Sequence, residues 1–266
     1  MRGFCKLGAD LKRMLLSSRF YLTVLAVFAL CILSVCGELK TAGSVYSLVS
    51  LRHGIGAFLM AMSVLAALPG SLFYREDLEN NYIHGLRSRV GHGGYCWPLV
   101  LTAAVGAFFA VLLGYLLFYG VLRLGYPMIA EADLAEMAYM NDATPYETWF
   151  FSGRGFLYFL GVFVTEAAAY SFMAVFALMM SVWVGNLFVL LSLPVLLYYG
   201  SISLCGDLNL PSAFRWYNVL KNGGFLRAAN PAPALMLAGV LAYFSGLILI
   251  EGMIFSCAVR RRYRHG

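Results

Sequence analysis

Charged residues are scarce in this sequence. Aspartate, glutamate, lysine and arginine together make up 12% of the 266 residues, whereas hydrophobic residues make up 61%. In a soluble globular domain about a quarter of the residues are charged and about half are apolar. The composition therefore excludes an ordinary soluble domain and favours a chain that lies mostly within a membrane.

The usual signatures of catalysis and of metal binding are also missing. The sequence contains no HExxH, GxSxG, Walker lysine loop or dinucleotide glycine pattern, which excludes the common proteases, esterases, nucleotide hydrolases and dehydrogenases. The cysteines occur singly, without a CxxC pair. His84, His92 and Cys96 are near one another, but their spacing matches no standard zinc module. We predict a chain that is not itself an enzyme and holds no metal or cofactor.

Long apolar runs are what the sequence has in abundance. A transmembrane helix needs ~20 mostly apolar residues to cross ~30 Å of hydrocarbon, and six runs approach or exceed this length. They cover residues 20–36, 55–73, 95–122, 155–184, 187–205 and 232–258. Within these runs, polar and apolar positions do not alternate as they do in a barrel strand. The sequence predicts an all-α polytopic membrane protein, one domain over residues 1–266 with six transmembrane helices.

The positions of lysine and arginine predict the orientation. Basic residues gather in residues 1–19, in the segment 75–94 and in the tail 259–266, and loops rich in such residues stay on the cytoplasmic side. We therefore expect both termini in the cytosol of a bacterial cell, the loop 123–154 outside, and the chain in the plasma membrane. The net charge of +6 reflects this topology, so we infer no nucleic-acid binding from it.

Segments outside the apolar runs carry further patterns. In residues 1–19, Phe4, Leu7, Leu11 and Leu15 recur every three or four positions, which predicts an amphipathic helix at the membrane interface, in contact with lipids. A basic leader that only sets the topology fits the same residues. The acids of the loop 123–154 are either cation ligands or a solvated face. The loop 37–54 is short and shows no chemistry of note.

Two carboxylates interrupt the apolar runs. Glu166 lies ~17 Å along its run, near the middle of the membrane, and Glu251 lies closer to the cytosolic end of the last run. A charge in hydrocarbon costs at least ~2.5 kcal/mol, so such residues normally face protein or water. Both are candidates for a translocation path. The alternative is that hydrogen bonds to neighbouring helices hold each of them as structural links.

The segment 75–94 combines charges with an apolar ridge. Leu78, Tyr82 and Leu86 recur every fourth residue, acids precede them and arginines follow. This order suits the helix dipole and predicts one short amphipathic helix, ended by the glycines after Val90. Such a helix on the cytosolic face either docks a soluble partner or folds against its own membrane helices.

Taken in order, these features resemble a known family. SSRFYL follows the amphipathic lead, FYRED and GLRSRVGHGGY lie in the charged segment after the second run, and SVWVGNLFVLLSLP, residues 181–194, predicts a tight hairpin between the fourth and fifth runs. The chain is similar to permease subunits of ATP-binding cassette (ABC) transporters of the ABC-2 type, a family of exporters. The likeness extends over essentially the whole chain.

The resemblance implies a transport subunit driven by a separate cytosolic ATPase, which would bind ATP and magnesium and dock on residues 75–89. Two permeases, identical or homologous, would form a dimer. The implied docking contacts are Glu76, Asp77, Leu78, Tyr82, Leu86 and Arg87. The residues alone leave two other classes open. One is a non-catalytic immunity or sensor protein that binds a peptide at its outer face, and the other is a membrane-embedded enzyme that uses Glu166 and an outer acid.

Overall fold

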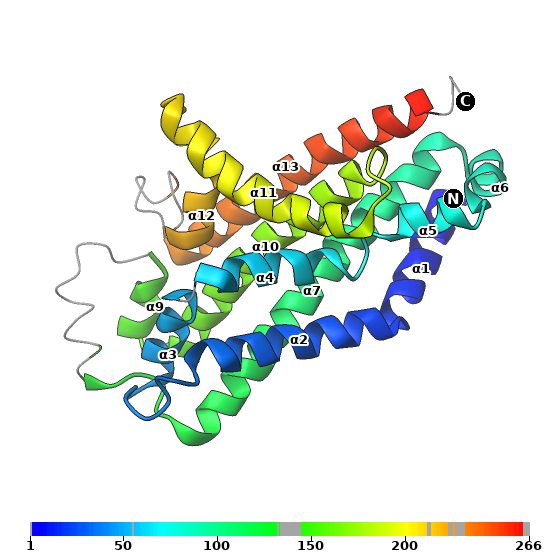
Figure 1. Cartoon of the computed structure of the whole chain (residues 1–266). Coiled ribbons are helices and arrows are strands. Elements are labelled where there is room, and N and C mark those ends of the chain that lie inside the picture. The colour runs from blue at the N-terminus through cyan, green and yellow to red at the C-terminus, as the bar shows by residue number, and fades with distance from the viewer. Residues whose placement is uncertain are drawn as a thin grey trace.

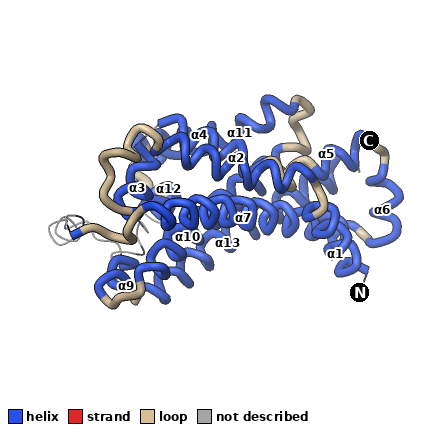
Figure 2. Tube along the Cα trace, turned by 90° about the horizontal axis from the view of Figure 1, so that it is seen from below, coloured by secondary structure: helices blue, strands red, loops and turns tan. Residues whose placement is uncertain are grey.

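The computed structural model of the chain describes residues 2–54, 56–131, 133, 145–211, 214–222, 226 and 232–262, and in these it has helices and no strands (Figure 2). Five helices are long and apolar enough to cross a membrane. They are α2 (Ser18–Val35), α7 (His92–Gly125), α10 (Gly155–Met180), α11 (Leu187–Asp207) and α13 (Pro233–Arg262). The predicted all-α, multi-pass membrane character is confirmed.

Shorter helices connect and cover these five. They are α1 (Arg2–Leu15), α3 (Val45–Leu51), α4 (Gly56–Ala67), α5 (Phe73–Glu79), α6 (Tyr82–Val90), α9 (Thr148–Phe151) and α12 (Trp216–Asn222), with the 3-10 turns η1 (Arg52–Gly54) and η2 (Pro145–Glu147). Both chain termini lie at one end of the molecule with α1, α5 and α6, which we call the terminal end. At the other end, the loop end, lie α3, α9 and α12 (Figure 1).

The second predicted span, 55–73, is not a long helix. Its helix α4 has 12 residues and extends about 18 Å, which is less than the hydrocarbon thickness. The helix ends because Pro69 disfavours helical backbone at the residue before it and offers no N–H. Gly70 then packs closely on α7, where a Cβ would lie 2.7 Å from the Ala103 Cα. Consequently α3, η1 and α4 form a broken helix rather than one continuous span.

The central helix of the bundle is α10. In its most apolar stretch 83% of the residues are buried, against 17% in the corresponding stretches of α11 and α13. It packs against α4, α7, α11 and α13, and the Tyr115 and Phe163 rings fill its contact with α7, with their centroids 5.2 Å apart. Residues on α10 are therefore shielded, whereas α11 and α13 present most of their surface to the surroundings.

The helices α2 and α7 approach each other closely at a glycine. A Cβ at Gly114 would lie 2.5 Å from the Val27 Cγ1 and 3.1 Å from the Val24 carbonyl oxygen. Gly120, further along the same helix, would meet nothing within 4 Å. Close packing at small residues is a main source of helix association in membranes, because lipid tails are as apolar as the side chains.

We expect Gly114→Ala to destabilise the protein, since overpacking of a tight contact costs about 1–3 kcal/mol. Thermal unfolding of the purified protein in detergent measures the effect, and the midpoint should fall by several degrees. Gly120→Ala is the matched control on the same helix and should be at least as stable as the wild type, because alanine favours helix over glycine. Equal midpoints for the two variants would contradict the close α2–α7 contact.

Candidate functional site

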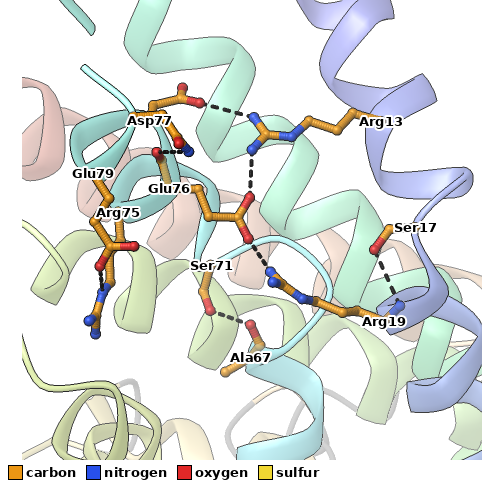
Figure 3. Close-up of polar contacts among 10 residues, drawn as sticks. Arg13, Ser17, Arg19, Ala67, Ser71, Arg75, Glu76, Asp77 and Glu79 are labelled. Carbon is orange, nitrogen blue, oxygen red and sulfur yellow. Dashed lines mark hydrogen bonds and ion pairs between the residues drawn. The ribbon is translucent and has the colours of Figure 1, made fainter. Parts of the chain in front are cut away.

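An ion-pair network at the terminal end joins α5 to the start of the chain (Figure 3). Arg13 Nη2 lies 2.5 Å from Glu76 Oε2 and Arg13 Nη1 lies 2.9 Å from Asp77 Oδ1. Arg19 pairs with the other carboxylate oxygen of Glu76. Asp77 is 3% exposed and accepts a hydrogen bond from the Tyr95 hydroxyl at 3.1 Å. The network therefore connects α1, α2, α5 and the beginning of α7.

The helix α1 packs on α7 through a face that carries charge. Lys6 and Asp10 form an ion pair one turn apart and are both buried, and the Lys6 Nζ lies 4.8 Å from the centroid of the Tyr95 ring. Burial raises the pKa of the Asp10 carboxyl, and the Lys6 ammonium opposes this rise. Leu15, predicted on the apolar face, is 46% exposed. Mutual neutralisation thus lets polar residues occupy the inner face of α1.

The single amphipathic helix predicted over residues 75–89 is wrong, because the structure divides it in two. Asn80 donates its side-chain amide to the Glu76 carbonyl oxygen at 2.8 Å and ends α5. Asn81 follows with φ 58°, a left-handed backbone that asparagine tolerates better than most residues. Leu78 and Tyr82 therefore do not continue one ridge.

The predicted docking residues have different surroundings. Glu76 and Asp77 face the arginines of their own chain, Leu78 packs against the core, and Tyr82 is 61% exposed. Leu86 and Arg87 belong to α6, and their side chains lie outside the described residues. The docking role stays a prediction, and its most accessible described residue is Tyr82.

A second charged site lies inside the bundle. Arg52 in η1 pairs with Glu166 in α10, and their side chains are 1% and 3% exposed. His53 Nε2 lies 3.2 Å from the same Glu166 oxygen, and this side chain is 36% exposed. The Arg52 guanidinium carbon is 4.8 Å from the centroid of the Tyr115 ring and 5.2 Å from that of Phe163, within the range of cation–π attraction.

The break between α3 and α4 brings Arg52 to this position. The Ser44 hydroxyl caps α3 by accepting from the Ser47 N–H at 3.1 Å, and it donates to Asp133. The helix then tightens into η1, which carries Arg52 and His53. The prediction that the loop 37–54 has no chemistry is wrong. The signal for this site in the sequence is an Arg-His pair, Arg52 and His53, directly before an apolar run.

Several buried polar atoms at and around the Arg52–Glu166 pair have no hydrogen-bond partner among the described groups. The Nε and Nη1 of Arg52 and the hydroxyl of Tyr170 form no hydrogen bond with the protein groups that the structure describes. A buried polar group left unpaired costs about 1–3 kcal/mol, so we expect water or a polar ligand group to reach these atoms. Two roles are predicted for Glu166, a place in a translocation path and a structural link between helices. The structure shows Glu166 paired with Arg52 of another helical segment. This contact does not test a role in translocation.

Glu251 differs from Glu166 because the described residues form no ion pair with it. It is 6% exposed on α13, and its Oε2 has no hydrogen-bond partner among the described residues. Next to it, a Cβ at Gly252 would lie 2.8 Å from Trp97 of α7. Arg262, near the end of α13, donates to the Val182 carbonyl oxygen instead. The role of Glu251 in a translocation path stays a prediction.

Little in the described residues suggests a metal site. No group of three histidines, cysteines, aspartates or glutamates gathers there, and none of the six cysteines forms a disulfide in the part of the chain that the structure describes. In the loop 123–154, which is predicted to lie outside, Glu136 and Asp142 fall outside the described residues. No family model, no curated protein and no solved structure matches the chain. Fold and sites define a class, a helical multi-pass membrane protein with a buried ion pair.

We predict that removing either partner of the central pair destabilises the protein. Arg52→Met and Glu166→Leu should each cost about 3–5 kcal/mol, because each leaves a buried charge unpaired, whereas the double variant should regain much of this loss. Thermal unfolding of the four proteins in detergent completes a double-mutant cycle. Arg75→Met, which breaks the more exposed Arg75–Glu79 pair, is the control and should change little. Strictly additive losses would contradict the coupling.

We expect Arg13 to hold α5 in place at the terminal end. Arg13→Gln should loosen α5, because Asp77 and Glu76 lose their shared partner. Hydrogen exchange of the amides in residues 73–79 should become faster, while that in α10 should not change. Lys12→Gln removes the same charge from the neighbouring, exposed position and should leave the exchange of α5 as it is. If both variants behave alike, Arg13 does not hold this helix in place.

Proposed function

We propose that this chain is the membrane-spanning permease subunit of an ABC exporter of the ABC-2 type. The observation that carries the proposal is the attachment of α5 to α1, α2 and α7 through Arg13, Arg19 and Tyr95. A short element fixed to several helices can pass a push from a motor protein on to all of them. The order of the sequence motifs gives independent support.

In this proposal a cytosolic ATPase binds ATP and magnesium and contacts α5 and α6. Because Glu76 and Asp77 are engaged within the chain, the exposed ring of Tyr82 is the main described contact. Aromatic side chains of this kind often dominate the binding energy of interfaces. Leu78 lies behind this surface, and the proposal assigns further contacts to Leu86 and Arg87 of α6.

The topology follows from the same assignment. The terminal end faces the cytosol of the plasma membrane, so both termini are cytosolic and α1 lies in the membrane interface. The broken helix α3–η1–α4 is then the second of six crossings, since it leads from the loop end toward the terminal end (Figure 1). A charged break inside a crossing is tolerated where protein surrounds it, as Tyr115 and Phe163 surround Arg52.

The transport cycle uses two such permeases, identical or homologous. ATP-driven closure of the two ATPases pushes α5 and α6, and the network passes this motion to α1, α2 and α7. The helix α10 is anchored to η1, which precedes α4, by the Arg52–Glu166 pair, so the two groups of helices shift relative to each other. Glu166 and Glu251 face the path between them, and the alternation of two packed arrangements moves the substrate outward.

The test is copurification of the tagged chain with a nucleotide-binding protein in mild detergent, followed by an ATPase assay. Tyr82→Asp should weaken this association at least about tenfold without changing thermal unfolding of the permease. Leu208→Asp is the matched control, because this residue is similarly exposed, at 64% against 61%, and follows the end of α11. A chain that elutes alone and without ATPase activity would favour the sensor or immunity class.

A further inference from the structure

A groove opens on the side of the bundle at the terminal end. It lies between the end of α13 and the turn that joins α10 to α11, and its volume is about 710 Å³. Its wall includes Trp183 from the turn and a stripe of α13 residues. A volume of this size is in the range of sites that bind small molecules.

The residues of α13 that line the groove are apolar at one end of the groove and basic at the other. Met253, Ile254, Cys257, Arg261 and Arg262 recur at helix spacing and line the groove from one face of this helix. Met253 and Arg261 are about 12 Å apart along the axis, at 1.5 Å per residue. The apolar part therefore lies deeper along a helix of membrane-crossing length, and both guanidinium groups lie at its end.

The other groove residues fit the boundary between hydrocarbon and water. Trp183 is 59% exposed, and tryptophan concentrates at the level of lipid head groups. Met253 and Ile254 are 55% and 45% exposed. Arg262 donates to the Val182 carbonyl oxygen, which holds this side chain at the rim of the groove. Among the described residues that line the groove, none is acidic and able to neutralise the two arginines.

We propose that this groove binds one anionic phospholipid, with its phosphate between Arg261 and Arg262 and an acyl chain along Met253, Ile254 and Trp183. The argument is complementarity of charge and of polarity. A soluble anion would leave the apolar wall uncovered, and a neutral lipid would leave two guanidinium groups without a counter-ion. Basic pockets at the ends of membrane helices recognise acidic head groups in this way. The proposal does not depend on the transporter assignment.

Binding can be measured by native mass spectrometry of the full chain in detergent. The probes are phosphatidylglycerol and phosphatidylcholine with the same acyl chains. The wild type should bind phosphatidylglycerol more tightly. The double variant Arg261→Gln, Arg262→Gln should lose this preference, with about a fivefold weaker affinity for each charge removed. Arg260→Gln is the matched control, because Arg260 is exposed on the adjacent position and does not line the groove. Its affinity should stay within about twofold of the wild type.

A second variant keeps the test independent of the arginines. Cys257→Trp fills the middle of the groove and should weaken binding of both lipids, even if the double arginine variant does not fold. Inorganic phosphate at millimolar concentration should not displace phosphatidylglycerol, because phosphate lacks the acyl contact. Displacement by phosphate would show an anion site instead and overturn the proposal.

Two further outcomes would also overturn it. The first is equal affinity for the two lipids in the wild type, or equal loss in the Arg260→Gln and double variants. The second is a groove covered by another copy of the chain. With Cys5 and Cys36, which are also exposed, replaced by serine, Cys257 should react with a maleimide in detergent and become protected when phosphatidylglycerol is added. Protection without lipid, in a protein that elutes as a dimer, would assign this surface to the second copy.

Discussion

A carboxylate in the middle of an apolar helix needs a counter-ion, and the arrangement of this bundle depends on how Glu166 obtains one. Its partner comes from Arg52, which lies beside a break between two short helices. The break places α4 against the most shielded helix, α10, and two aromatic rings cover the guanidinium group. The ion pair thus fixes where α4 packs against α10, while Pro69 ends this helix after 12 residues.

Charged residues at the terminal end are also paired with one another. At the terminal end, Arg13 and Arg19 join α1 and α2 to the acids of α5, and Lys6 and Asp10 neutralise each other inside the contact of α1 with α7. Packing of small and apolar residues brings helices together but specifies their register weakly in lipid. Ion pairs at the terminal end and inside the bundle, together with the glycine contact between α2 and α7, supply that specificity.

The sequence was sufficient for the features that depend on local composition. The long apolar runs predict the helical class and five of the long helices to within a few residues, and the segment 181–194 predicts the turn before Leu187, where Asn186 caps α11. What it could not predict are contacts between distant segments. The pairing of Arg52 with Glu166 joins residues 114 positions apart. The division of α5 from α6 is local, at Asn80 and Asn81, but the apolar spacing of the segment gives no sign of it.

This separation along the chain also sets an order of assembly. Arg52 leaves the ribosome 114 residues before Glu166, and at about 5–20 residues per second it waits about 6–23 s for its counter-ion. Placing an unpaired arginine in hydrocarbon costs free energy. The segment from α3 to α4 therefore cannot reach its final packing until α10 has been inserted. The first part of the bundle therefore matures after its fourth long hydrophobic segment, and a chain truncated before Glu166 would present this arginine to the quality-control proteases of the membrane.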